Sequence, residues 1–267
     1  MGQYRLVAID VDGTLIQTGH SVTQRVTEAV SDALSQGIIV TLASGRMFRL
    51  VEPFVAHLGL TSPVICYGGA MIVEPPTRRT IYERGVPLEL AQKVIKEARE
   101  RQLDARAYVD NDVFVDRILP GRFNYESLTR IKAIEVGDLL THLKRDPSHL
   151  AIDSPPEGTR GLVEEMRTRF GTSLHVTTGH PLLVEFSRPM VHKGTALTWL
   201  ANHLGIPRDQ TLAIGDDWND VEMLRAAGLG VAVANAHPRV LGLAGRIVPS
   251  VADDGVAVAL EDLVLAP

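Results

Sequence analysis

The stretch Leu6-Val7-Ala8-Ile9-Asp10-Val11-Asp12-Gly13-Thr14, close to the N-terminus, decides the fold class. Its first four residues are apolar and predict a short strand buried on both faces, as strands of parallel sheets are. Two carboxylates and a glycine follow at once, and ligands of open α/β sheets bind where the strands end. The stretch therefore predicts a parallel sheet with a polar site at the carboxyl end of this strand.

The segments on either side of the chain's middle repeat the same alternation of strand and helix. After the first strand we expect helices at 23–36 and 48–58 and strands at 38–43 and 64–67. Towards the C-terminus we expect helices at 195–204, 221–227, 238–243 and 256–263, with strands at 212–214, 230–233 and 247–248. Alternating strands and helices indicate an α/β fold whose core is a Rossmann-like parallel sheet with crossover helices.

In the middle of the chain the predicted helices and strands no longer alternate regularly. Helices are expected at 88–101, 138–143 and 161–170, and strands at 107–109, 113–115, 150–152, 174–176 and 183–186. The tripeptide Asp110-Asn111-Asp112 is typical of a hairpin turn between two of these strands. We therefore predict a catalytic core of residues 1–82 and 189–267, with an inserted α+β domain at 83–188 that would act as a cap.

Composition excludes several classes of protein. The 267 residues carry a formal net charge of −5, and the basic residues are scattered, so the sequence predicts neither nucleic-acid nor membrane binding. No segment approaches the roughly 18 apolar residues of a membrane span. Cys66 is the only cysteine, which excludes an internal disulfide and favours a small buried side chain. We expect a cytoplasmic protein, and the sequence does not indicate an oligomeric state.

Polar clusters follow three of the predicted strands: Asp10 to Thr14, Ser44-Gly45-Arg46, and Gly215 to Asp220. Asp, Ser and Gly are also common turn and cap residues, and for Ser44-Gly45 alone that interpretation stays open. Together, however, the clusters bring up to five carboxylates to one edge of the sheet, where so much negative charge requires a cation. Because only oxygen ligands are offered, the expected ion is Mg²⁺.

These clusters, in this order, resemble the motifs of the haloacid dehalogenase-like superfamily in its phosphatase form. Asp10-Val11-Asp12-Gly13-Thr14 resembles the first motif and Ser44 the second. Lys193, in His192-Lys193-Gly194-Thr195, resembles the third, and Gly215-Asp216-Asp217-Trp218-Asn219-Asp220 the fourth. The insertion between the second and third motifs is similar to the α/β (C2B-type) cap of the Cof-type subfamily. One departure is Gly68-Gly69-Ala70, where such chains often have Asn in place of the first glycine.

The resemblance implies a catalytic role for four residues. Asp10 would attack phosphorus and form an aspartyl-phosphate, and Asp12 would protonate the leaving oxygen and then activate water. Ser44 would hydrogen-bond a phosphoryl oxygen. Lys193 would balance the charge of the nucleophile and the phosphate, as a compact point charge can.

The resemblance also implies a metal site and a substrate site. Mg²⁺ would be bound by Asp10, the backbone carbonyl of Asp12, Asp216 and Asp220, and would stabilise charge on the transferred phosphoryl group. Residues expected to contact or orient the substrate are Ser44, Gly45, Arg46, Lys193 and Asn219. His192 is interpreted as positional, Asp217 as part of the loop, and Trp218 as packing or the rim of the pocket.

The implied activity is Mg²⁺-dependent hydrolysis of phosphate monoesters of small metabolites, especially sugar phosphates. Two alternatives remain open on the sequence. A phosphomutase or phosphotransferase would use the same Asp10 and pass the phosphoryl group to a hydroxyl, and a catalytically inactive binding protein would retain only the fold. The intact set of Asp10, Asp12, Lys193 and Asp216 argues against the second alternative.

Overall fold

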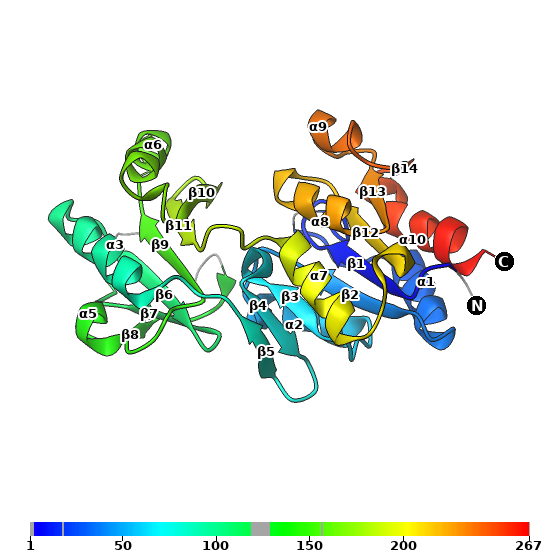
Figure 1. The fold of residues 1–267 in the computed structure, drawn as a ribbon, viewed down its shortest axis with the longest axis horizontal. Helices are drawn as coiled ribbons and strands as arrows, with labels where there is room; N and C mark the ends of the chain where they lie inside the picture. The colour runs from blue at the N-terminus through cyan, green and yellow to red at the C-terminus, as the bar shows by residue number, and fades with distance from the viewer. Residues whose placement is uncertain (1–2, 18, 119–128, 156, 267) are drawn as a thin grey trace. The chain divides into compact units, whose positions relative to one another are not determined.

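The computed structural model of this protein describes residues 3–17, 19–118, 129–155 and 157–266 (Figure 1). The chain divides into two compact units. The first, here called the core unit, consists of Met1–Tyr82 and His192–Pro267, and the second, the inserted unit, of Glu83–Val191.

The core unit is built on an eight-stranded sheet in the order β14-β13-β12-β1-β2-β3-β4-β5. The first six strands of this order are parallel to their neighbours, and β4 pairs antiparallel with β3. The parallel strands are β1 (Leu6–Asp10), β2 (Ile39–Ala43), β3 (Val64–Cys66), β12 (Thr211–Gly215), β13 (Leu229–Val233) and β14 (Arg246–Val248). The predicted parallel-sheet core is thus confirmed, and the sheet continues with β4 (Met71–Glu74) and β5 (Arg79–Glu83), two strands that were not predicted.

The strand order reverses at β1, which lies between β2 and β12. Right-handed crossovers place the helices that follow β1 and β2 on one face of the sheet and the helix that follows β12 on the other. The helices are α1 (Gln24–Ser35), α2 (Phe48–His57), α7 (Lys193–His203), α8 (Val221–Ala226), α9 (Pro238–Leu241) and α10 (Gly255–Leu260). A crevice forms outside the strand ends at such a switch point, so the fold directs ligands to the carboxyl end of β1.

The inserted unit has a six-stranded sheet in the order β10-β11-β9-β6-β7-β8, antiparallel except between β7 and β8. Alternate residues of β6, β9 and β11 share one apolar core with three helices, as the two-residue period of a strand requires. Its strands are β6 (Ala105–Val109), β7 (Asp112–Val115), β8 (Ile134–Glu135), β9 (His149–Asp153), β10 (His175–His180) and β11 (Leu183–Ser187). Its helices are α3 (Leu88–Glu100), α5 (Leu139–His142) and α6 (Thr159–Phe170).

The hairpin predicted around Asp110-Asn111-Asp112 joins β6 to β7. The loop has two residues instead of three, because Asp112 already pairs with Val109. Asp110 and Asn111 both have positive φ, at 52° and 64°. Two central residues with positive φ make the type I′ geometry that suits the twist of a hairpin, and Asp and Asn tolerate it.

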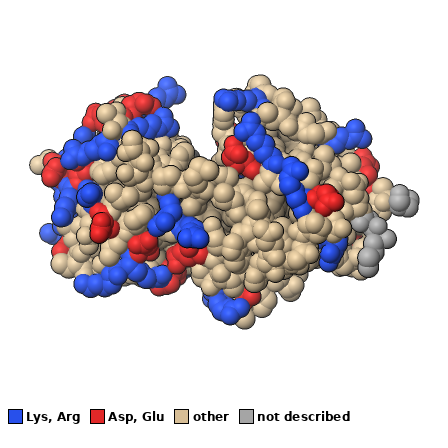
Figure 2. Space-filling model, in the orientation of Figure 1, with Lys and Arg blue, Asp and Glu red and all other residues tan. Residues whose placement is uncertain are grey.

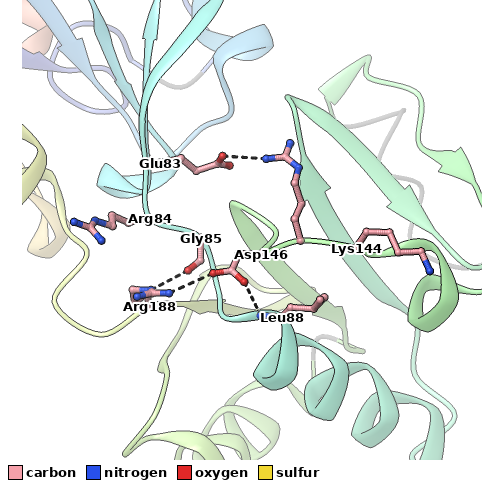
Figure 3. A pocket seen from close by; sticks show the side chains of 8 residues that line it. Glu83, Arg84, Gly85, Leu88, Lys144, Asp146 and Arg188 are labelled. Carbon is pink, nitrogen blue, oxygen red and sulfur yellow. Dashed lines mark hydrogen bonds and ion pairs between the residues drawn. The ribbon is translucent and has the colours of Figure 1, made fainter.

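The side chain of Asp146 stabilises the N-terminus of α3, the first helix of the inserted unit (Figure 3). The residue before α3 is Pro87, which makes no side-chain cap hydrogen bond. Instead, Asp146 accepts a hydrogen bond from the backbone N–H of Leu88 at 2.8 Å, and its other oxygen pairs with Arg188 at 3.3 Å. Arg188 also donates to the carbonyl of Gly85 at 3.0 Å. The two ends of the inserted unit are therefore tied together beside a cavity of about 430 Å³ that these residues line.

The surface and the cysteine agree with an ordinary globular protein. On the face drawn in Figure 2, Lys and Arg side chains are interspersed with Asp and Glu on both units. Within the described residues, no helix is both long and apolar enough to cross a bilayer. Cys66 is buried at the end of β3, and that burial raises the pKa of its thiol.

Candidate active site

Asp10 is the last residue of β1 and lies where the sheet changes direction. It pairs with Ala43, the last residue of β2, and its neighbour Ile9 pairs with Ile214 of β12. Five consecutive buried residues form this strand, and Asp10 itself is only 4% exposed. A buried carboxylate is costly without a partner, so the residues around Asp10 decide what it can do.

Lys193 supplies the partner. It is the first residue of α7, two residues earlier than the predicted start of this helix, and its side chain is fully buried. Its Nζ donates to Oδ1 of Asp10 and, at 2.7 Å, to Oδ1 of Asp220. Burial by itself lowers the pKa of Lys193, but the charges of Asp10 and Asp220 outweigh burial and raise it above its ordinary value. Lys193 is therefore a fixed positive charge between two carboxylates.

One lysine does not balance the carboxylates gathered here. Asp10, Asp216 and Asp220 offer oxygens that all lie within 4.8 Å of one another. Burial, and then the charge of Asp220, raise the pKa of Asp10 well above its ordinary range despite Lys193. Burial likewise raises the pKa of Asp216. Three carboxylates against one ammonium leave an excess of negative charge, which a hard divalent cation with oxygen ligands would neutralise. The donor set therefore fits Mg²⁺.

The loop after Asp10 is shaped around Asp216. Thr14 donates its hydroxyl to Oδ1 of Asp216 at 2.8 Å. Gly13 has a φ of 87°, and a Cβ at this position would lie 2.3 Å from Oδ2 of Asp216. Only glycine combines this backbone conformation with so close an approach. The first and fourth motifs are thus brought into direct contact by residues that the sequence places 202 positions apart.

Asp220 uses both carboxylate oxygens within the protein. Oδ1 accepts from Lys193, and Oδ2 accepts the backbone N–H groups of Asp216 at 3.0 Å and Asp217 at 3.1 Å. The side chain is fully buried. Asp220 therefore fixes the loop that presents Asp216 and the position of Lys193.

Asp12 and Arg46 form a pair at the more open side of the cluster. The guanidinium of Arg46 contacts both oxygens of Asp12, with Nε at 2.8 Å from Oδ2 and Nη2 hydrogen-bonded to Oδ1. The Asp12 side chain is 44% exposed. Ser44 is fully buried, and its Oγ accepts from the backbone N–H of Arg46 at 3.1 Å. That bond leaves the hydroxyl proton of Ser44 as a donor for another group.

Comparison with known proteins identifies the family of this chain. A family model described as haloacid dehalogenase-like hydrolase matches residues 7–260. The chain belongs to this family. The hydrolase is 30% identical to the protein YxeH of Bacillus subtilis (strain 168), over 98% of this chain and 99% of that one. It is 26% identical to the 5-amino-6-(5-phospho-D-ribitylamino)uracil phosphatase YitU of the same organism, over 94% of each chain.

A third relative and a solved structure support the same family. The chain is 26% identical to the HMP-PP phosphatase of Serratia proteamaculans (strain 568), over 90% of this chain and 87% of that one. Its structure resembles that of a haloacid dehalogenase-like hydrolase from Bacteroides thetaiotaomicron with a TM-score of 0.87, at 27% identity, over 97% of this chain and 98% of that one. The resemblance stated from the four motifs is confirmed, and the chain is a hydrolase of the phosphatase type.

Two of the hydrolase's expected substrate-contacting residues lie outside the buried cluster. Asn219 and Gly45 are both exposed. Asn219 sits on the short turn of 3₁₀ helix Trp218–Asp220, with no side-chain hydrogen bond to the described residues of the cluster. Arg46 contacts Asp12, two residues after Asp10, through its guanidinium.

Sequence reasoning missed Thr14 and Asn235 of the hydrolase. Asn235 follows β13, and its amide donates to the carbonyl of Gly13 at 2.8 Å while its Oδ1 accepts from Val251 N–H at 2.8 Å. It therefore ties the loop after Asp10 to the C-terminal segment. The same strand-end rule that singled out Asp10 and Asp216 could have found Asn235, since it stands two residues beyond the end of a parallel strand.

The loop Tyr67–Ala70 of the hydrolase approaches the start of α7. Gly69 has a φ of 107°, and a Cβ there would lie 2.4 Å from the carbonyl oxygen of His192. His192 caps the helix: its Nδ1 accepts from Thr195 N–H, and its own N–H donates to the Thr195 hydroxyl, both at 3.2 Å. This capping box holds the first turn that carries Lys193. The glycine pair thus supports the position of Lys193.

Proposed function

We propose that this hydrolase cleaves phosphate monoesters of small metabolites, sugar phosphates among them, in a Mg²⁺-dependent reaction through an aspartyl-phosphate on Asp10. The observation that carries the proposal is the buried cluster in which Lys193 bridges Asp10 and Asp220 while Asp216 lies within 4.8 Å. A carboxylate that is buried, held by an ammonium and placed at a strand end suits nucleophilic attack on phosphorus.

The proposal assigns each residue its part in the reaction. Asp10 attacks phosphorus, and the ester bond to the leaving oxygen breaks as the new bond forms. Asp12 gives a proton to that leaving oxygen and then takes one from the water that hydrolyses the aspartyl-phosphate, restoring Asp10. Ser44 donates its free hydroxyl proton to a phosphoryl oxygen. Lys193 offsets the negative charge of Asp10 and of the phosphoryl group.

The metal would be held by Asp10, the backbone carbonyl of Asp12, Asp216 and Asp220. When bound, Mg²⁺ supplies charge neutralisation to the phosphoryl group during transfer. Because Asp220 already accepts hydrogen bonds at both oxygens, we assign it mainly to orienting Asp216 and Lys193. Gly45, Arg46 and Asn219 are proposed to contact or orient the substrate once it is bound.

The inserted unit is proposed to act as the cap. It would exclude water while the aspartyl-phosphate forms and would supply contacts to the leaving group. The pivots would lie near Glu83-Arg84 and Arg188-Pro189. The bonds from Arg188 to Gly85 and Asp146 support this choice, since they tie both ends of the unit to its own body.

The test is phosphate release from a panel of phosphorylated metabolites with and without Mg²⁺. The panel contains sugar phosphates and, because a relative is named for it, 5-amino-6-(5-phospho-D-ribitylamino)uracil. The Asp10→Asn variant is compared with Asp32→Asn, which changes an exposed aspartate of α1 in the same way. We expect release to require Mg²⁺, to persist in Asp32→Asn and to be lost in Asp10→Asn.

A different product pattern would overturn parts of the proposal. Isomerised phosphate esters without free phosphate would indicate a phosphomutase using the same nucleophile. Full activity of Asp10→Asn, or equal rates with Mg²⁺ and with EDTA, would contradict the proposed mechanism. For Asp12→Asn we expect a loss of roughly 10²- to 10⁴-fold, the range of general acid–base catalysis.

A further inference from the structure

Three side chains gather beyond the carboxyl ends of β12 and β13, near the proposed metal site. They are Trp218, His237 and Arg239, here called the Trp218 cluster. The guanidinium carbon of Arg239 lies over the indole ring of Trp218, 4.4 Å from its centroid. The His237 ring is tilted against the same indole, with ring centroids 5.1 Å apart. Trp218 remains 47% exposed despite these two neighbours.

The segments that carry the cluster are bonded to the active site. Trp218 lies two residues after Asp216, in the turn that Asp220 closes. The backbone N–H of His237 donates to the carbonyl of Asp216 at 2.9 Å. Two residues earlier, Asn235 donates to the carbonyl of Gly13. The cluster is therefore fixed to the loops that present the metal ligand and follow the nucleophile.

Stability accounts for only part of the cluster, and the proposed chemistry for none of it: Nδ1 of His237 accepts a hydrogen bond from the backbone N–H of Arg239 at 3.2 Å and so caps α9. An indole left half exposed forgoes much of the free energy that its burial would contribute. Arg239 is exposed, and among the described residues no carboxylate forms an ion pair with it. No step assigned to Asp10, Asp12 or Lys193 uses these side chains. What stays exposed is the aromatic surface of Trp218 and the guanidinium N–H donors of Arg239.

We propose that the Trp218 cluster binds a planar heteroaromatic ring in the leaving group of the substrate. The inference rests on the proposed function, since the ring belongs to the alcohol part of the phosphate ester. A planar ring uses both features of the cluster: it stacks on the indole or on the outer plane of the guanidinium, and its carbonyl or ring-nitrogen acceptors take N–H bonds from Arg239. A simple anion would use Arg239 and leave the indole exposed.

A matched pair of substrates isolates the ring. Uridine 5′-monophosphate and ribose 5-phosphate carry the same 5′-phosphate on the same sugar, and only the first has the ring. We expect the wild-type enzyme to show a higher kcat/KM for the nucleotide. Replacing one stacking aromatic typically costs about tenfold or more in binding of a base. The ratio of the two kcat/KM values should therefore fall about tenfold in Trp218→Ala and by less than threefold in Trp218→Phe.

Arg239→Gln should lower the ratio as well, whereas Arg246→Gln, which changes an exposed arginine of β14, should not. Equal ratios in wild type and Trp218→Ala would overturn the inference. So would an equal loss for both substrates in Trp218→Ala, because the indole would then act on the metal loop and not on the ring. No preference for the nucleotide in the wild type would also overturn it.

Fluorescence makes the inference independent of turnover. The chain has two tryptophans, and Trp199→Phe leaves Trp218 as the reporter. In an Asp10→Asn background, uridine 5′-monophosphate should change the emission of Trp218, and ribose 5-phosphate should change it far less. In the control variant, Trp218→Phe with Trp199 retained, uridine 5′-monophosphate should leave the tryptophan emission unchanged. If the active enzyme released no phosphate but the emission of Trp218 still changed on addition of the nucleotide, only the hydrolase mechanism would be rejected. If the emission of Trp218 did not change, the ring site would be rejected.

Discussion

Gly13 is the residue on which the contact between the first and fourth motifs depends. Gly13→Ala would put a methyl group 2.3 Å from the Asp216 carboxylate and would strain a backbone with a φ of 87°. Gly19→Ala is the matched control, because Gly19 has a φ of 81° and no atom within 4 Å of its Cβ position. The control measures the backbone strain alone, about 1–2 kcal/mol of unfolding free energy.

We expect Gly13→Ala to lose more unfolding free energy than Gly19→Ala and also to lose Mg²⁺-dependent phosphate release. Urea unfolding and an activity assay on both variants make the comparison. If the two variants had the same stability and the same activity, the close approach of the two motifs would be of no consequence, and this account of Gly13 would be wrong.

Helix α7 begins at Lys193, and its first turn is capped by His192, whose ring must be neutral to act as the cap. Nδ1 of His192 accepts a hydrogen bond, which a protonated ring could not do. Burial lowers the pKa of His192 from its ordinary value of 6.5, although the charge of Glu222 opposes the shift. Below pH 6.5 the unfolded chain therefore takes up a proton that the folded chain resists. The stability from this group is full above pH 6.5 and is lost as pH falls through the lowered pKa.

His192→Asn tests this pH dependence, since Asn is a good N-cap and does not titrate. We expect the wild type to lose more unfolding free energy than His192→Asn between pH 7.5 and pH 5.5, measured by urea titration. All other titrating groups are shared by the two proteins, so the difference belongs to residue 192. Parallel losses in both would mean that the cap does not depend on the charge state of the ring.

Helix α3 follows a proline, Pro87, and depends on Asp146 for its cap (Figure 3). Asp146→Ala should cost about 1 kcal/mol of unfolding free energy, in the range for loss of an N-cap. Asp146→Asn keeps an acceptor oxygen for Leu88 and should cost less, because the half-exposed pair with Arg188 contributes little. Lys144→Ala, at the same cavity, is the control. A loss in Lys144→Ala equal to that in Asp146→Ala would show that the cavity, not the cap, matters.

The sequence predicts most elements because their signals are local. An apolar run that ends in Asp10 gives β1, and Asp110-Asn111 gives the hairpin. Strand β4 and the edge strands β5 and β8 were not predicted, because their residues show no clear alternation and such short strands depend on their pairing partners. The strand predicted through Tyr67 ends at Cys66, where the chain turns with a φ of 49° at Tyr67.

For the candidate site, the sequence likewise predicts the residues but not the contacts between them. Asp10, Lys193, Asp216 and Asp220 come from motifs, and the structure brings all four together in one cluster, in which only Asp216 is partly exposed. The bond from Thr14 to Asp216 and the bond from Asn235 to Gly13 join positions more than 200 residues apart. No local pattern contains a contact of that kind, so the sequence indicates the residues but not which pairs of them meet.

At the scale of the whole molecule, the proposed metal ligands all belong to the core unit, so Mg²⁺ should stabilise the two units unequally. A ligand that binds only the folded state adds about 2.7 kcal/mol at 100 times its Kd. Amide hydrogen exchange with and without Mg²⁺ measures this unit by unit. We expect slower exchange in peptides of Met1–Tyr82 and His192–Pro267, and little change in peptides of Glu83–Val191.

The Asp216→Asn variant should lose this response, because it removes one of the three clustered carboxylates. Slower exchange in both units to the same extent would mean that the ion couples their stabilities, so that the inserted unit could not open while Mg²⁺ is bound. A response confined to the core unit would leave the inserted unit free to move on its two linkers while the metal stays in place, as a cap that admits substrate in every turnover must do.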